Sequence, residues 1–151
     1  MSVIDLREPF RTQVENGIAK LNDDRIPYVI TSTVRLQATQ FLLWLQGRLP
    51  ESLIIMYRMH LGLSSLTTED MERIVTQTDG VILISNHQKG LAIDIVPSDT
   101  NGKAIWPFSG DARWKEISSR MVACGCVWGG DWLDFPDLPH YEMKGADSAT
   151  I

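Results

Sequence analysis

The chain has 151 residues and a net charge of −5, and its 44% hydrophobic and 22% charged residues are typical of a globular protein. It lacks the surplus of lysine and arginine that binds nucleic-acid phosphates, so we expect no nucleic-acid partner. No apolar run reaches the roughly 18 residues that cross a bilayer, so we expect no membrane span. The segment Met1–Asp5 has no basic region followed by an apolar core, which predicts no secretory signal.

The first half of the chain predicts two helices and a strand. Apolar residues spaced three or four apart from Val3 to Leu21 predict an amphipathic helix. Pro27–Ile30 is interpreted as a short strand. A second helix is expected from about Leu36 to Gln46, ended by Gly47.

The segment Leu49–Gly80 is less regular. It is mostly apolar up to Leu63, and acidic residues in the first turn then favour a helix from Thr67 to about Gln77. A lid, a wall of the substrate site and an oligomer contact remain open as its role. His60 lies in this segment, and we interpret it as a structural or surface histidine.

Regular elements alternate with turns in the second half. Asp99–Gly102 is a plain surface turn in our interpretation, rather than a weak calcium site. Cys124 and Cys126 point to opposite faces of one segment, which disfavours a mutual disulfide, so we expect two ordinary thiols. The expected elements are the strands Val81–Ile84, Ile93–Val96, Cys126–Trp128 and Tyr141–Met143, and the helix Asp111–Cys124. Together they predict an α+β domain with a small antiparallel sheet flanked by helices, over residues 1–143, with a disordered tail over 144–151.

Three side chains predict a metal site. Asp94 lies in the strand Ile93–Val96, on the face shared with Ala92 and Val96, where a carboxylate is costly to bury without a partner. His87 lies between the two apolar strands, and His140 follows a proline turn. Two histidines and one aspartate are the three-ligand set of catalytic Zn²⁺, with a fourth position left for water. Asp137, three residues before His140, is then available as a base.

The motif Ser-x-His-x-x-Gly-x-Ala-x-Asp (85–94), with Trp-Gly-Gly-Asp-Trp (128–132) and Asp-x-Pro-His (137–140), resembles the zinc D-Ala-D-Ala carboxypeptidases and L-alanyl-D-glutamate endopeptidases, a group that includes many phage endolysins. The resemblance covers about Ile30 to Met143. It implies the fold shared by these peptidases and the hedgehog signalling domain. The segment Leu49–Gly80 departs from the family pattern as an insertion.

The resemblance also implies roles for individual residues. Zn²⁺ would be held by His87, Asp94 and His140, and Asp137 would be the general base. Arg35 would stabilise an oxyanion or hold a substrate carboxylate. Further substrate-binding candidates are Gln40, Ser85, Trp128 and Trp132. Asp131 and Glu142 are candidates to orient a histidine ligand.

The predicted function is zinc-dependent hydrolysis of the stem peptide of peptidoglycan, as an L-alanyl-D-glutamate endopeptidase. D-Ala-D-Ala carboxypeptidase or dipeptidase activity is the first alternative. A zinc-bearing module without catalysis is the second. Without a signal segment, we expect the protein to stay in the cytoplasm until it is released and to act on the cell wall; its oligomeric state is not predicted.

Overall fold

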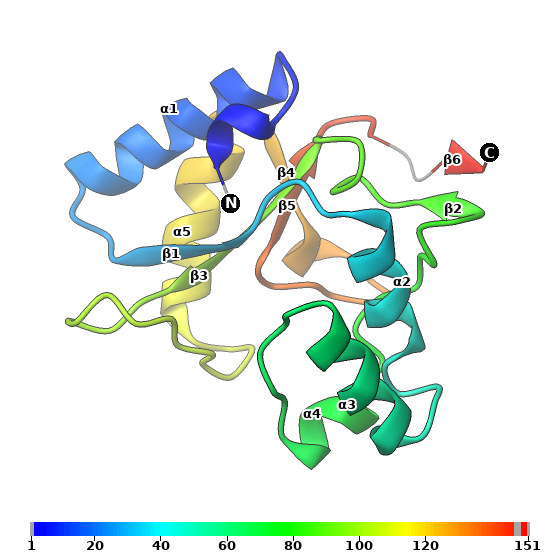
Figure 1. Ribbon diagram of the computed structural model, residues 1–151. Coiled ribbons are helices and arrows are strands. Elements are labelled where there is room, and N and C mark those ends of the chain that lie inside the picture. Colours follow the sequence, from blue (N-terminus) through cyan, green and yellow to red (C-terminus); the bar gives the residue numbers. More distant parts are fainter. Residues whose placement is uncertain (1, 147–148, 151) are drawn as a thin grey trace. The chain divides into compact units, whose positions relative to one another are not determined.

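A computed structural model describes residues 2–146 and 149–150 (Figure 1). The described residues form two compact units. The sheet unit contains residues 2–34 and 89–146, and the helical unit contains residues 35–88 with 149–150. The expectation of one domain over 1–143 stays a prediction, since compactness does not test whether the units fold separately. In the expected tail, residues 144–145 form a turn and 149–150 a short strand, while 147, 148 and 151 lie outside the described residues.

A four-stranded antiparallel sheet organises the sheet unit, with strand order β1-β3-β5-β4. The elements, in chain order, are the 3₁₀ turn η1 (Val3–Asp5), α1 (Phe10–Asp23), β1 (Tyr28–Ser32), β3 (Ala92–Pro97), α5 (Ala112–Val122), β4 (Cys126–Trp128), the 3₁₀ turn η2 (Gly129–Asp131) and β5 (His140–Met143). A small antiparallel sheet with helices beside it confirms the predicted α+β class.

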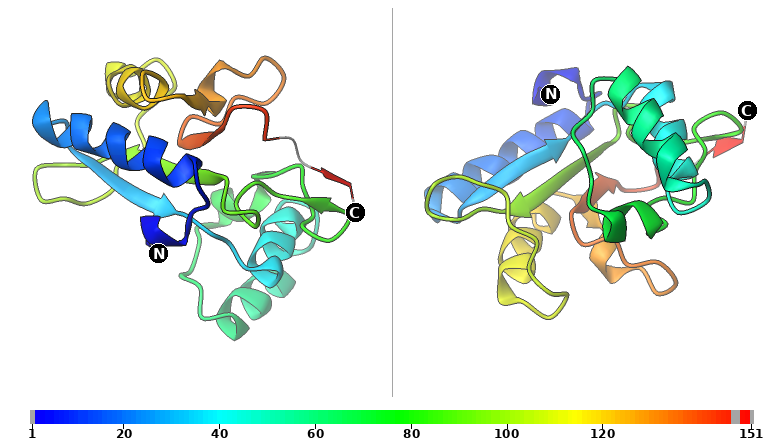
Figure 2. Two further views of the ribbon diagram at one scale, coloured as in Figure 1. Left: turned by 90° about the horizontal axis from the view of Figure 1, so that it is seen from above. Right: turned by 60° about the horizontal axis from the view of Figure 1, so that its bottom comes forward.

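Alternation along β3 sets the two faces of this sheet. Ile93 is opposite Tyr141 of β5, and both side chains are fully buried in the hydrophobic core. The core also takes in apolar side chains of α1 and α5, which lie side by side in Figures 1 and 2. Asp94, the next residue, is opposite His140, so both project from the other face. The helices therefore cover one face and leave the polar pair on the other.

The predicted helix from Val3 to Leu21 is wrong in its first third. The structure has the short turn η1, an irregular stretch, and then α1 from Phe10. Pro9 explains the interruption, because proline has no N–H to donate and disfavours helical backbone in the residue before it. Phe10, Val14 and Leu21 still line the buried side of α1, as the spacing indicated.

The helical unit contains α2 (Gln37–Leu45), α3 (Glu51–His60), α4 (Thr68–Glu72), β2 (Leu83–Ile84) and β6 (Ala149–Thr150). Strands β2 and β6 pair antiparallel. A second cluster of buried residues, Leu42, Ile54 and Met71, joins the three helices. Helix α3 was not predicted, and the helix expected to reach Gln77 ends at Glu72.

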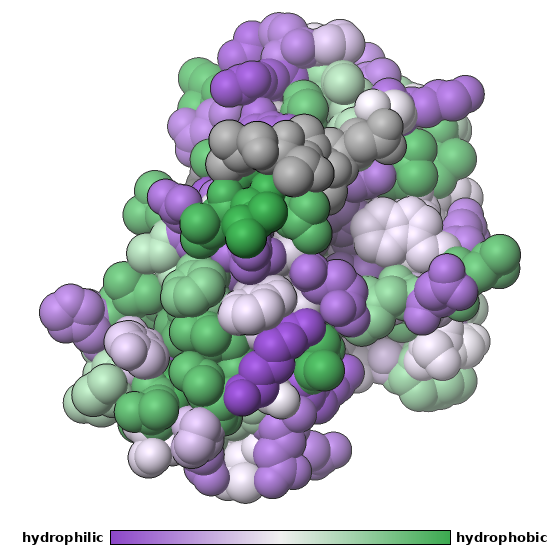
Figure 3. Space-filling view, turned by 90° about the vertical axis from the view of Figure 1, so that its right-hand side faces the viewer, coloured by the Kyte–Doolittle hydropathy of each residue, from purple (hydrophilic) through white to green (hydrophobic). Residues whose placement is uncertain are grey.

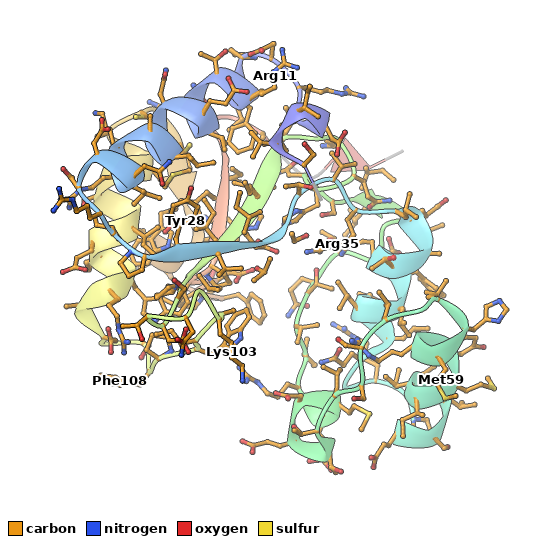
Figure 4. The ribbon with its side chains drawn as sticks, turned by 60° about the vertical axis from the view of Figure 1, so that its left-hand side comes forward. Arg11, Tyr28, Arg35, Met59, Lys103 and Phe108 are labelled. Carbon is orange, nitrogen blue, oxygen red and sulfur yellow. The ribbon has the colours of Figure 1, made fainter. Side chains whose placement is uncertain are left out.

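Hydrophobic side chains remain exposed on this unit (Figure 3). Met59 of α3 is 75% exposed and points away from the helix bundle in Figure 4. The exposed apolar residues of α2, α3 and the residue before α2 are Leu36, Phe41, Leu53, Ile55, Met56, Tyr57 and Met59. Within the described residues, no helix is both long and apolar enough for a membrane crossing.

Candidate metal centre

The sheet register brings Asp94 and His140 together. These residues are direct partners on β3 and β5, and His140 Nδ1 lies 3.2 Å from Asp94 Oδ1. The other ring nitrogen, Nε2, lies 3.2 Å from Glu142 Oε2, because Glu142 is two residues further along β5 on the same face. The imidazole is buried, with a carboxylate at each nitrogen.

These neighbours also change the proton affinity of His140. Burial of the imidazole lowers its pKa, but the hydrogen bonds with Asp94 and Glu142 and the negative charges of Asp94 and Asp137 outweigh burial. The pKa of His140 is raised to about 9. A metal ion binds the neutral imidazole, so it has to displace this proton, while the negative charge of the carboxylates attracts the cation.

His87 lies in the turn that follows β2. Its backbone N–H donates to Ser85 Oγ at 3.2 Å, and its carbonyl oxygen accepts from the backbone N–H of Arg35. Gln88 closes the turn, because its side-chain oxygen accepts from the N–H of Ser85. Ser85 is buried, and its hydroxyl supports the turn that carries His87.

The predicted ligands can meet at one ion. One possible ligand atom from each of His87, Asp94 and His140 can be chosen so that all lie within 4.8 Å of one another. Two imidazoles and one carboxylate are the donor set of catalytic Zn²⁺ sites. The residues present therefore fit zinc.

Asp137 lies next to His140. The His140 N–H donates to the backbone oxygen of Asp137 at 3.1 Å, and the Asp137 N–H donates to the backbone oxygen of Gly129 at 2.9 Å. A β-carbon on Gly129 would lie 2.7 Å from the backbone oxygen of Asp137 and 3.0 Å from His140 Cβ. Gly129 is thus required for the close approach of the loop that carries Asp137 to the start of β5.

The side chains of Arg35 and Gln40 are hydrogen-bonded to each other in the helical unit. Arg35, labelled in Figure 4, lies just before α2, and its Nη1 donates to Gln40 Oε1 at 2.7 Å. Arg35 is partly exposed, whereas Gln40 is 0% exposed. Gln40, predicted to bind substrate, therefore contacts Arg35 from the interior.

The aromatic candidates differ in exposure. Trp128 is buried, and its indole N–H donates to the backbone oxygen of Leu138 at 2.7 Å. Trp132 is half-buried, and its ring lies 5.1 Å, centroid to centroid, from the ring of His140. Trp132 therefore contacts a predicted zinc ligand.

Asp131 is predicted to orient a histidine ligand, and this role stays a prediction. Its carboxylate is exposed and pairs with Lys115 at 3.4 Å. The 3₁₀ turn η2 directs Asp131 outward, toward α5. Glu142 alone, of the two acidic candidates, lies against His140.

Sequence reasoning missed two residues that hold Gln40. Thr76 and Thr78 accept hydrogen bonds from its amide, although they are 36 and 38 residues away in the chain. Threonines in a polar loop carry no pattern that indicates such a contact, so these two residues could not be found from the sequence.

Comparisons with known proteins bear on this geometry. Residues 78–143 match the family model described as D-alanyl-D-alanine carboxypeptidase. A segment of 65 residues is 38% identical to the peptidoglycan L-alanyl-D-glutamate endopeptidase CwlK of Bacillus subtilis. Over residues 78–143 the chain is therefore similar to this peptidase family. The CwlK match covers 39% of each protein, so this chain spans well under half the length of the curated relative it matches.

Two solved structures share the fold of this chain. The L-Ala D-Glu endopeptidase ChiX of Serratia marcescens superposes with a TM-score of 0.58 and 16% identity, over 94% of this chain and 83% of ChiX. The vancomycin-resistance D,D-pentapeptidase VanY, in complex with Zn(II), superposes with a TM-score of 0.57 and 15% identity, over 93% of this chain and 73% of VanY. At such identities the likeness concerns the fold, and it agrees with the predicted one.

Proposed function

We propose that this protein is a zinc-dependent peptidase that cleaves the stem peptide of peptidoglycan and acts on the cell wall. The observation that carries the proposal is that His87, Asp94 and His140 can bring three ligand atoms within 4.8 Å of one another, with Asp137 adjacent to His140. The match of residues 78–143 to a peptidase family supports the same chemistry.

In this proposal, His87, Asp94 and His140 hold the metal. A bound Zn²⁺ supplies Lewis acidity toward the scissile carbonyl and lowers the pKa of a water ligand to about 7. Asp137 accepts a proton from the attacking water and returns it to the amine nitrogen as the peptide bond breaks. Glu142 holds the imidazole of His140 by its second nitrogen, which fixes the orientation of the ring.

Arg35 supplies the positive charge in the proposed reaction. Its guanidinium donates either to the oxygen that becomes negative as water adds to the carbonyl or to a carboxylate of the stem peptide. Trp132, half-buried and against His140, would line the site where the peptide binds.

The bond between L-alanine and D-glutamate is the cleavage site best supported. CwlK, which is 38% identical over 65 residues, is described as an L-alanyl-D-glutamate endopeptidase. The alternative is removal of terminal D-alanine, because the family model that matches residues 78–143 is described as D-alanyl-D-alanine carboxypeptidase. The two reactions release fragments of different mass.

Purified muropeptides, incubated with the zinc-loaded protein and analysed by mass spectrometry, test the proposal. An endopeptidase leaves L-alanine on the sugar, whereas a carboxypeptidase shortens the peptide by D-alanine at its far end. A chelator should stop either reaction, and zinc should restore it. A protein that binds zinc and leaves every muropeptide intact would instead be a binding module without catalysis.

A further inference from the structure

Helix α2 is hydrogen-bonded to the segment Thr67–Gly80 at its carboxyl end. Gln46 Nε2 donates to the backbone oxygen of Asp70 at 2.6 Å, and the Gly47 N–H donates to that of Met71 at 2.9 Å. Arg48, the next residue, donates through Nη1 to the backbone oxygen of Thr76 at 3.3 Å. Consecutive residues thus attach the end of α2 to one segment of the chain.

Gln40 makes the same kind of connection near the amino end of α2. Its Nε2 donates to the backbone oxygen of Thr78 at 2.8 Å, and the hydroxyls of Thr78 and Thr76 lie at 3.1 and 3.2 Å. Its Oε1 is the atom that accepts from Arg35. Acceptors on one side and a cationic donor on the other fix the orientation of the amide. With 0% exposure, Gln40 can act on a bound peptide only through Arg35.

Gly80 leaves the space that Gln40 fills. A β-carbon on Gly80 would lie 2.6 Å from Gln40 Cγ and 2.9 Å from Gln40 Cβ, and also 2.8 Å from Gln88 Oε1. Gly80 also has φ +74°, and its carbonyl oxygen accepts from Gln88 Nε2 at 3.0 Å. The chain therefore turns at Gly80 directly against Gln40, a few residues before the turn of His87.

From these contacts we propose that the segment Thr67–Gly80 is a brace that holds the Arg35 guanidinium in one orientation through Gln40. Gln40 is a positioning residue in this arrangement. The inference rests on the proposed function, in which Arg35 contacts the substrate. It also gives a role to part of the segment that departs from the family pattern.

The physical reason for a brace is the flexibility of arginine. A partly exposed guanidinium on a long side chain loses conformational freedom each time it binds a substrate group. A donor fixed before the reaction avoids that cost and the reorganisation of surrounding dipoles. The hydrogen bond from Arg35 Nη1 to Gln40 Oε1 holds one edge of this planar group.

The test uses two variants and one matched control. Each of the two variants disturbs the contact between Gln40 and Arg35 in a different way. Gln40→Leu removes the acceptor and the donors at similar volume. Gly80→Ala leaves Gln40 intact but places a methyl group against it and against Gln88 Oε1, so its zinc content is measured separately. Gly62→Ala is the control, because Gly62 also has positive φ, +66°, in the same unit, yet its β-carbon would meet no atom within 4 Å. Backbone strain alone would affect Gly62→Ala and Gly80→Ala alike.

Two measurements are made on the wild type and on each variant. Nitrogen NMR of the guanidinium reports whether rotation of Arg35 is restricted, and muropeptide hydrolysis gives kcat and KM. We expect Gln40→Leu and Gly80→Ala to loosen the Arg35 guanidinium and to lower kcat/KM by about 100-fold, with the zinc content unchanged in Gln40→Leu. Gly62→Ala should keep the restricted guanidinium and stay within about twofold of the wild type.

The two proposals fail in different ways. If the wild type hydrolyses muropeptides, and both Gln40→Leu and Gly80→Ala keep its kcat/KM and a restricted Arg35, the brace is refuted. If no protein hydrolyses muropeptides but the NMR signal of Arg35 changes only in Gln40→Leu and Gly80→Ala, the proposed function fails and the brace stands. A loss of restriction in Gly62→Ala equal to that in Gly80→Ala would also overturn the brace.

Discussion

The backbone oxygen of Asp137 occupies the space that a side chain at position 129 would need, and Gly129 leaves that space open. A β-carbon at Gly129 would approach the backbone oxygen of Asp137 to 2.7 Å and His140 Cβ to 3.0 Å. The Asp137 N–H is bonded to the Gly129 carbonyl oxygen, which ties the same two residues together. The position of the proposed base and of one proposed ligand therefore depends on a glycine.

Gly129→Ala should weaken both zinc binding and hydrolysis. The added methyl group has to push backbone rather than a flexible side chain, so we expect a loss of about 1–3 kcal/mol in the free energy of unfolding. Gly110→Ala is the control, since its β-carbon would meet mainly the exposed ring of Phe108, at 3.0 Å. Urea unfolding and zinc titration of both variants give the comparison, and equal effects would contradict the prediction.

Glu142 and Asp131 provide a direct comparison of two acidic candidates. Glu142→Ala removes the carboxylate at His140 Nε2, and we expect zinc affinity to fall about 10- to 100-fold. Asp131→Ala removes only an exposed pair with Lys115, so zinc affinity should not change. Competition with a chromogenic chelator measures both. A larger loss in the Asp131 variant would favour the role that the sequence predicted for it.

Asp137→Asn separates proton transfer from metal binding. The amide has the size of the carboxylate but cannot accept the proton from water, so hydrolysis should fall by a factor of about 10² to 10⁴. The zinc content should stay at the wild-type level, which elemental analysis can verify. Asp134→Asn, at an exposed position in the same loop, should hydrolyse muropeptides normally. Undiminished activity of Asp137→Asn would remove Asp137 from the proposed mechanism.

Asp79 should make stability depend on pH. Hydrogen bonds from the backbone N–H groups of Val81, Leu83 and Ile82 outweigh desolvation and lower the pKa of Asp79 from 3.8. A group with a lowered pKa in the folded protein stabilises it above the unfolded pKa, and this contribution is lost as the pH falls through the folded pKa.

The comparison is between the wild type and Asp79→Asn, unfolded with urea at a series of pH values. We expect the wild type to be more stable at pH 7 and this advantage to shrink as the pH falls below about 3.8. An advantage that stays constant across the acidic range would mean that the charge of Asp79 is not its source.

The elements that carry the predicted ligands could be found from the sequence because their patterns are local. Alternation along Ala92–Val96 placed Asp94 on the face opposite Ile93, and the register confirms this. The strand Cys126–Trp128 was predicted with its observed bounds. The likeness of motifs then linked His87 and His140, which are far apart in the chain, and no periodicity could have done so.

Helix α3 was not predicted because a charged residue is buried in it and a hydrophobic residue is exposed. Arg58 is buried and donates to the backbone oxygen of Ser64, while Met59 beside it is 75% exposed. An amphipathic pattern requires the opposite distribution, so periodicity gave no helix here. The next helix was predicted too long, since the β-branched run Ile74–Thr76 disfavours helical backbone and Thr76 bonds Gln40 instead.

The order of strands has a consequence for the lifetime of a bound metal. Strands β3 and β5 are central in the sheet: Asp94 is paired on both sides, with Ser32 and His140, and His140 begins a strand that pairs with β4 from its next residue, Tyr141. Such strands are among the last parts of a protein to exchange their amide hydrogens with solvent. His87 lies in a turn, where opening costs less. We therefore expect dissociation of the ion to start with His87, while the other two ligands stay in place until the sheet itself opens.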